Sequence, residues 1–213
     1  MTKKQKTDFH IGAALLAAFL LWTAALCFMD VKPIGPMEST VGFASLNRFL
    51  HGLTGVHMAL YILTDWLSLV PLGFVSGFAL LGIIQWIRRK HLLRVDFSIL
   101  ALGGFYLAVA AVFFFFEKVV INYRPVLIGG ILEASYPSST TMLVMCVMPT
   151  SVMQLRNRIK NTALRKLVAF ALTAFTVFMV IGRLISGVHW FSDILGGALL
   201  SGGLVRLYRA VTT

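Results

Sequence analysis

Three polar side chains lie close together in an otherwise apolar stretch, "GRLISGVHWFSD", which runs from Gly182 to Asp193. His189 and Asp193 are four residues apart, so on a helix they share one face, and the carboxylate can hold the imidazole in one tautomer. A nucleophile with an orienting partner is the arrangement that covalent catalysis uses. Arg183 precedes the pair across a turn that contains Gly187, which lets the arginine fold back over the same pocket. A simple interfacial hydrogen bond is the alternative interpretation of the pair.

Two earlier stretches, "INYRPV" and "SYPSSTTM", carry groups that suit an anionic ligand. Arg124 lies in the first stretch, and Lys118 comes shortly before it. The second has a row of hydroxyls after Pro137, namely Ser138, Ser139, Thr140 and Thr141. Because an apolar segment follows, we expect a helix to begin here, and its free N–H groups and dipole favour phosphate. A plain N-cap is the alternative, although it requires fewer hydroxyls.

The composition indicates that the chain is an integral membrane protein. Hydrophobic residues make up 58% of the 213, only 13% are charged, and the mean hydropathy is +0.86. The apolar residues come in long blocks, and a helix needs roughly 20 of them to cross the hydrocarbon core. Blocks of about that length are 11–29, 68–87, 97–116, 139–155, 166–184 and 190–207. The sequence therefore predicts an all-α, polytopic membrane helix bundle with six transmembrane helices, in a single domain over residues 1–213.

The segment between the first two blocks is apolar enough to suggest a seventh span. It carries His51, His57 and Asp65, and a charge near the centre of a bilayer costs about 2.5–3.5 kcal/mol even on the insertion scale. We therefore predict that residues 41–64 form an interfacial or re-entrant helix between spans one and two.

The basic residues support six spans and give an orientation. With a cytoplasmic N-terminus, fourteen of the nineteen Lys and Arg residues lie inside, as the positive-inside rule requires. These are Lys3, Lys4, Lys6, Arg88, Arg89, Lys90, Arg94, Arg156, Arg158, Lys160, Arg165, Lys166, Arg206 and Arg209. We expect a multi-pass protein of the plasma membrane with both termini cytoplasmic. Cytoplasmic loops account for the net charge of +11, so no nucleic-acid partner is needed.

The remaining basic residues, Lys32, Arg48, Lys118, Arg124 and Arg183, fall on the outer side. Three of them, Lys118, Arg124 and Arg183, lie where an apolar block ends. Short loops there can bring these ends together, and a cationic pocket facing outward invites a phosphate. Snorkelling towards the lipid headgroups is the alternative for any one of them. We expect an extracytoplasmic site.

These motifs resemble those of the type 2 phosphatidic acid phosphatase superfamily, which includes lipid phosphatases and, more distantly, vanadium haloperoxidases. The family pattern is Lys, six residues, Arg-Pro; then Pro-Ser-Gly-His; then Ser-Arg, five residues, His, three residues, Asp. Arg124-Pro125 corresponds to the first part, Pro137-Ser138 to the second, and Arg183, His189 and Asp193 to the third at the family's spacing. The motifs cover 117–193, and the six-span layout extends the resemblance over the whole chain.

The resemblance implies a metal-independent phosphatase that needs no cofactor and acts on a phosphorylated lipid in the bilayer. His189 attacks phosphorus in such a mechanism and forms a phosphohistidine that water hydrolyses, while Asp193 orients the imidazole. The groups implied for phosphate binding are Lys118, Arg124, Ser138, Ser139, Thr140 and Arg183. Scattered carboxylates around a single histidine do not suggest a metal site.

Three positions depart from the family pattern. Glu117 stands at the family's lysine position, and Lys118 follows one residue, or about 100° of helix, later. Gly182 replaces the serine before Arg183. Thr140 stands at the histidine expected to protonate the departing alcohol, and a threonine hydroxyl cannot act as a general acid near neutral pH.

Two functional hypotheses follow. In the first, the protein is a lipid phosphatase for a substrate of the polyprenyl diphosphate or phosphatidylglycerol phosphate type; a diphosphate expels a phosphate, which leaves without an acid. His51 or His57 could otherwise supply the proton. In the second, the protein is a catalytically weakened homologue that binds phospholipids or transfers phosphate to another lipid. The retained pair of His189 and Asp193 favours the enzyme, whereas the sequence leaves the lipid and the oligomeric state open.

Overall fold

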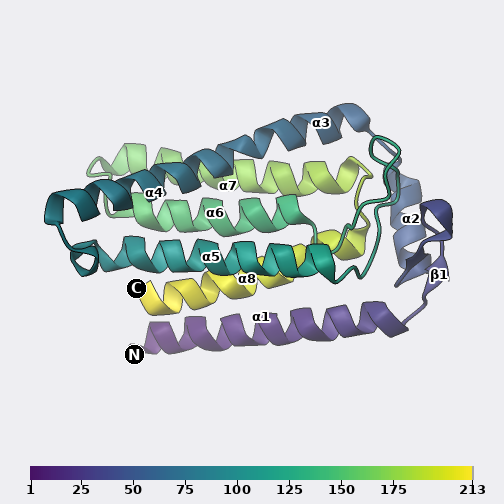
Figure 1. Cartoon of the computed structure of the whole chain (residues 1–213), viewed down its shortest axis with the longest axis horizontal. Coiled ribbons are helices and arrows are strands. Elements are labelled where there is room, and N and C mark those ends of the chain that lie inside the picture. Colours follow the sequence, from purple (N-terminus) through teal and green to yellow (C-terminus); the bar gives the residue numbers. More distant parts are fainter. Residues whose placement is uncertain (213) are drawn as a thin grey trace.

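The computed structural model describes residues 1–212, and Thr213 lies outside the described residues. The chain is almost entirely helical (Figure 1). The helices are α1 (Lys3–Phe28), α2 (Ala44–Thr54), α3 (Met58–Leu67), α4 (Leu69–Arg89), α5 (Phe97–Lys118), α6 (Ser139–Arg156), α7 (Thr162–Ile185) and α8 (Phe191–Thr212). Two 3-10 helices, η1 (Pro36–Glu38) and η2 (Leu92–Arg94), and a small antiparallel pair, β1 (Lys32–Pro33) and β2 (Thr40–Val41), lie in the connections. The predicted all-α class is confirmed.

Local hydrogen bonds set where several long helices begin. At the start of α1 the side chains of Thr2 and Gln5 form a reciprocal capping box. The Ser138 hydroxyl accepts the N–H of the third residue of α6, and the Asn161 side chain does the same for α7. The helix start predicted at 139 is confirmed, whereas α7 begins at Thr162, four residues before the predicted start at 166, because Asn161 caps it there.

Helix α6 lies in the middle of the bundle, where it packs against α7 and α8 and also contacts α4 and α5 (Figure 1). Ten of its eighteen residues are buried. On the outside, α1 packs along α8, so the two termini lie side by side at one end. Because the polar starts of α6 and α8 both lie at the opposite end, this packing brings the hydroxyl row close to His189 and Asp193.

In the described part of the chain, five helices are long and apolar enough to cross a membrane: Lys3–Phe28, Met58–Arg89, Phe97–Lys118, Thr162–Ile185 and Phe191–Thr212. They correspond to five of the six predicted blocks. The sixth block is α6, which is more polar because it carries threonines, serines and Pro149 among its apolar residues. Since neighbouring helices cover α6, its length and burial suit a central helix rather than one that faces lipid.

The prediction for residues 41–64 needs correction, because these residues do not form one helix. Gly55, with a φ of +67°, separates α2 from α3. Helix α2 lies across the end of the bundle, whereas α3 runs directly into α4 and lengthens the second apolar stretch to Met58–Arg89 (Figure 1). The prediction rested on the cost of the charge of Asp65, but this carboxylate forms an ion pair with Arg183, 2.8 Å away.

The clustered basic residues lie at one end of the bundle. Figure 1 shows that the starts of α1, α5 and α7 and the ends of α4, α6 and α8 share this end, here called the basic end. The other end, here called the site end, holds α2, the loop 119–138 and the turn 186–190. The bundle is therefore polarised by charge along its long axis.

Candidate active site

Three segments meet at the site end: the loop 119–138, the start of α6, and the turn 186–190 that delivers His189. The turn depends on Gly187, which has a φ of +68°. A Cβ at this position would lie 1.9 Å from the carbonyl oxygen of Gly55, so the turn also packs backbone against backbone. Glycine is therefore needed at residue 187 to place His189 between α7 and α8.

His189 and Asp193 face each other, as their spacing predicts. The Nδ1 atom of His189 lies 3.7 Å from Oδ2 of Asp193, and both residues are buried. The same Oδ2 accepts the backbone N–H of Trp190 at 2.9 Å, which closes the first turn of α8. The carboxylate thus caps the helix and directs its charge at the imidazole, while Nε2 points away from it.

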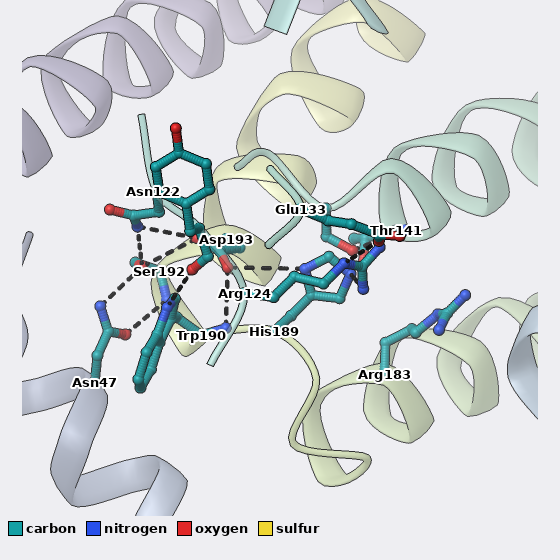
Figure 2. A network of polar contacts seen from close by, with 12 residues as sticks. Asn47, Asn122, Arg124, Glu133, Thr141, Arg183, His189, Trp190, Ser192 and Asp193 are labelled. Carbon is teal, nitrogen blue, oxygen red and sulfur yellow. Dashed lines mark hydrogen bonds and ion pairs between the residues drawn. The ribbon is translucent and has the colours of Figure 1, made fainter. Parts of the chain in front are cut away.

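Neutral donors fix the other side of Asp193 (Figure 2). Oδ1 accepts a hydrogen bond from Asn122 Nδ2 at 3.1 Å and one from the Ser192 hydroxyl at 3.4 Å. Asn47 donates from Nδ2 to the Ser192 hydroxyl at 2.9 Å and accepts the Ser192 N–H at 3.1 Å. Because these partners carry no charge, they hold the carboxylate in place without cancelling its negative charge.

Arg124 approaches the histidine from the loop 119–138. Its Nη1 lies 3.2 Å from Nε2 of His189. A guanidinium can only donate, so Nε2 holds the lone pair and the ring hydrogen lies on Nδ1, towards Asp193. On its other edge, Arg124 Nε lies 2.9 Å from Oε2 of Glu133, across a turn in which the Arg124 N–H also bonds the Glu133 carbonyl.

The surroundings keep the imidazole neutral. Burial, with help from the positive charges of Arg124 and Arg183, lowers the pKa of His189 to about 4 against the opposing effect of Asp193. Near neutral pH the Nε2 lone pair is therefore available. A neutral imidazole with a fixed tautomer is the form that can act as a nucleophile.

Arg183 reaches the site from the last turn of α7 and is 2% exposed. Its Nη2 donates to the Thr140 hydroxyl at 2.7 Å and to Oδ1 of Asp65 at 2.8 Å. Its Nε and Nη1 are buried and have no hydrogen-bond partner among the described residues. The ring of Tyr61 lies 4.9 Å from the guanidinium carbon of Arg183 and 6.0 Å from that of Arg124. Unused donors of a fixed arginine can hold phosphate oxygens.

The four hydroxyl residues at the start of α6, residues 138–141, have different roles. Ser138 caps the helix with its side chain, and its N–H donates to the Asp193 carbonyl at 3.0 Å, which ties α6 to α8. Ser139 lines a small pocket together with His189. Thr140 binds Arg183, and the buried hydroxyl of Thr141 has no hydrogen-bond partner among the described residues. The row thus combines a cap with groups that face the site.

At the end of α5, Glu117 is near His189, whereas Lys118 makes no polar contact with the described part of the site. Lys118 is exposed, and within the described residues its side chain forms no hydrogen bond or ion pair with the other site residues. Glu117 lines the small pocket beside Ser139 and His189. This pocket has a volume of only about 10 Å³, no more than one water needs. Arg124 and Arg183 do not line it, so it is not the space in which these two arginines would hold a phosphate.

His51 and His57 are both engaged with backbone carbonyls. His51 Nε2 lies 3.0 Å from the Gly187 carbonyl, and His57 Nε2 lies 2.8 Å from the Thr54 carbonyl. Because a carbonyl only accepts, each Nε2 carries its hydrogen there. The ring of His51 also lies 5.3 Å from the ring of Trp190, so this residue supports the turn that carries His189.

Several residues of the site had escaped sequence reasoning. These are Asn47, Tyr61, Asp65, Asn122, Glu133, Trp190 and Ser192. Asn122 lies within the same "INYRPV" stretch as Arg124, and Ser192 lies between His189 and Asp193, so proximity to a motif could have indicated both. Asn47 and Tyr61 come from helices distant in the sequence and carry no such indication.

The glycine before Arg183 has a packing reason. A Cβ at Gly182 would lie 2.9 Å from Cγ2 of Thr64, closer than real side chains allow. Gly182 therefore lets α3 approach α7, and this approach brings Asp65 to Arg183. The glycine at this position thus accompanies the ion pair between Asp65 and Arg183.

Comparisons with known proteins show the family to which the chain belongs. A model of the PAP2 superfamily matches residues 101–213, which include Arg124, Arg183, His189 and Asp193. No curated protein sequence matches the chain significantly. The fold is similar to the crystal structure of the first transmembrane PAP2-type phosphatidylglycerolphosphate phosphatase from Bacillus subtilis, with a TM-score of 0.61 and 19% sequence identity over 94% of both chains. Because the family model covers more than half of the chain, this protein belongs to the PAP2 superfamily.

Proposed function

We propose that the protein is a membrane lipid phosphatase in which His189 forms a phosphohistidine intermediate. The observation that carries this proposal is the orientation of one imidazole: Nε2 faces Arg124 Nη1 at 3.2 Å, and Nδ1 faces the buried carboxylate of Asp193 at 3.7 Å. The nucleophilic lone pair therefore points to where a guanidinium would hold a phosphate. Family membership supports the same reaction class.

In the first step, the Nε2 lone pair forms a bond to phosphorus, and the bond from phosphorus to the leaving oxygen breaks with its electron pair. The imidazole becomes positively charged, and Asp193 stabilises this charge through Nδ1–H. In the second step, water attacks phosphorus, the N–P bond breaks, and inorganic phosphate leaves with His189 neutral again. Arg124 and the unused donors of Arg183 would bind the equatorial oxygens, where charge spreads in phosphoryl transfer.

The leaving group sets the substrate class that we propose. Thr140 accepts a hydrogen bond from Arg183 and cannot protonate an alcohol near neutral pH, and the Nε2 hydrogens of His51 and His57 are committed to carbonyls. When the terminal phosphorus of a lipid diphosphate is attacked, the leaving group is the lipid monophosphate, which needs no such acid. A polyprenyl diphosphate therefore fits best. The solved relative is a phosphatidylglycerolphosphate phosphatase, which makes phosphatidylglycerol phosphate the second substrate to test.

The charge polarity of the bundle supports a membrane orientation. We propose six spans, counting the covered helix α6, in the plasma membrane, with the basic end and both termini cytoplasmic and the site extracytoplasmic. A cysteine introduced at Thr212 in a Cys27→Ala background tests the orientation. An impermeant thiol reagent should leave it unmodified in intact cells, and modification from outside would reverse the assignment.

The test of the proposed function is phosphate release by the purified full chain in detergent from polyprenyl diphosphate, phosphatidylglycerol phosphate and phosphatidic acid. We expect phosphate release by the parent. His189→Ala should abolish it, whereas EDTA should leave it unchanged, because arginine side chains and backbone N–H groups, and no metal ion, would bind the phosphate. Loss of activity with EDTA that magnesium restores would point to a different mechanism.

A weakened, phospholipid-binding homologue is the second candidate, and specific contacts favour it. Both arginines of the site already have a carboxylate partner within 3 Å, namely Glu133 for Arg124 and Asp65 for Arg183. Lipid binding without phosphate release, equal in the parent and in His189→Ala, would establish this candidate. Labelled phosphate recovered on an acceptor lipid instead of in solution would establish a phosphotransferase.

A further inference from the structure

A cavity of about 610 Å³ lies at the basic end, far from the site. Helices α6 and α7 form one side of it, and residues of α1 and α8 form the other. Its size falls in the range of about 300–1,000 Å³ that is typical of ligand pockets. The lining changes from basic residues near the ends of the helices to apolar residues such as Met148, Leu172 and Val177 further along them.

The lining of the cavity carries an excess of positive charge. Lys4, Arg156 and Arg209 come from three different helices and all line it. Among the described residues, the side chains of Lys4 and Arg156 form no hydrogen bond or ion pair. Arg209 Nε lies 3.2 Å from Oδ2 of Asp8, and this carboxylate also forms an ion pair with Arg206. No acidic residue is among the described residues that line the cavity.

The apolar wall lies at the depth of lipid acyl chains. Arg156 is the last residue of α6, and Met148 precedes it by two turns, or about 12 Å along the helix. One leaflet of the hydrocarbon core is about 15 Å thick. A molecule with its anionic group at Lys4 and Arg156 would therefore place an apolar chain beside Val152 and Val177, the more accessible apolar residues of the lining.

We propose that this cavity binds an anionic phospholipid from the leaflet at the basic end. The phosphate lies between Lys4 and Arg156, and one acyl chain occupies the apolar part between α6 and α7. Basic pockets between membrane helices are suited to anionic headgroups, and each Lys or Arg near the surface strengthens the attraction. This lipid would bind at the end opposite His189 and independently of any catalytic function.

Native mass spectrometry of the purified full chain tests this proposal, with phosphatidylglycerol and phosphatidylcholine of identical acyl chains as probes. The protein should retain one phosphatidylglycerol and release phosphatidylcholine. Lys4→Ala combined with Arg156→Ala should weaken phosphatidylglycerol binding by roughly tenfold or more. Arg88→Ala combined with Arg94→Ala is the matched control, because it removes two exposed cations from the same end but outside the cavity, and should leave binding unchanged.

A variant of the apolar part tests the cavity itself without a change of charge. Thr173 lines the cavity on the exposed side of α7, so Thr173→Trp fills space without disturbing the core and should also lower phosphatidylglycerol retention. Equal retention of both lipids by the parent would overturn the proposal, as would equal losses in the two double variants. If the Lys4 and Arg156 variant does not fold, parental retention in Thr173→Trp overturns it.

Discussion

Arg183 on α7 donates a hydrogen bond from Nη2 to Oδ1 of Asp65 on α3 at 2.8 Å, although 118 residues separate them in the chain. The same Nη2 donates to Thr140, so Nη1 and Nε remain for a ligand. Glu133 stands in a similar relation to Arg124, with Nε and Oε2 2.9 Å apart. Each arginine of the candidate site is thus oriented by a carboxylate, and a phosphate has to bind in the presence of both negative charges.

The first prediction concerns the charge of Glu133. Glu133→Gln should make inorganic phosphate or vanadate a stronger inhibitor by up to about fivefold, because a half-exposed ion pair is worth roughly 0–1 kcal/mol and no longer competes for Arg124. Inhibition constants of lipid hydrolysis measure this effect. Glu38→Gln, at an exposed position outside the site, is the control. Weaker inhibition in Glu133→Gln would mean that the glutamate assists anion binding.

The second prediction concerns pH. Burial, with help from the two arginines, lowers the pKa of His189 from 6.5 to about 4. A protonated Nε2 cannot attack, so kcat/KM of the free enzyme should stay level as pH falls through 6.5 and decline only towards about 4. Arg124→Gln removes one positive neighbour and should move this decline to higher pH. An acidic limb at 6.5 in the parent would show that the imidazole is not desolvated.

The third prediction concerns Thr140. If a monoester needs a proton on its leaving oxygen, a positioned acid is worth about 10²–10⁴ in rate. Thr140→His should therefore raise hydrolysis of phosphatidic acid more than hydrolysis of a polyprenyl diphosphate. Thr140→Asn, which adds a polar side chain but no acid, serves as the control. A parent that already cleaves phosphatidic acid as fast as diphosphates, and loses this ability in His51→Ala or His57→Ala, would show that the acid has been relocated.

The fourth prediction concerns Asp193. Asp193→Asn keeps an acceptor for the Trp190 N–H but loses the negative charge beside Nδ1, so kcat should fall by about 10²–10⁴ while the protein stays folded. Steady-state kinetics with a thermal unfolding curve separate the two effects. An unchanged kcat with a lowered unfolding temperature would assign Asp193 to structure alone.

The sequence was sufficient to predict the long helices, because their caps and apolar lengths are local features. The predicted block 97–116 corresponds to Phe97–Lys118 and the block 139–155 to Ser139–Arg156. The start of the second span could not be found in this way. Asp65 raises the cost of a span as an isolated charge, and only the packing of α3 on α7 at Gly182 reveals its partner.

The spacing of His189 and Asp193 also sufficed to predict that they face each other, since both depend on one turn and one helix start. The residues that hold the pair did not follow from local patterns. Asn47 reaches Ser192 from α2, and Tyr61 reaches both arginines from α3. Single amides and tyrosines on distant helices have no periodicity or motif that would indicate a shared site, so tertiary packing alone assigns them.

The central claim is that phosphorus becomes bonded to His189 Nε2. The most direct measurement is a rapid quench of the parent with lipid carrying labelled phosphate, followed by peptide mass spectrometry that locates any protein-bound phosphate. We predict label on His189 that forms and decays at rates compatible with turnover, and neither label nor phosphate release in His189→Ala. Turnover by the parent without label on the protein, or release by His189→Ala at the parental rate, would contradict it.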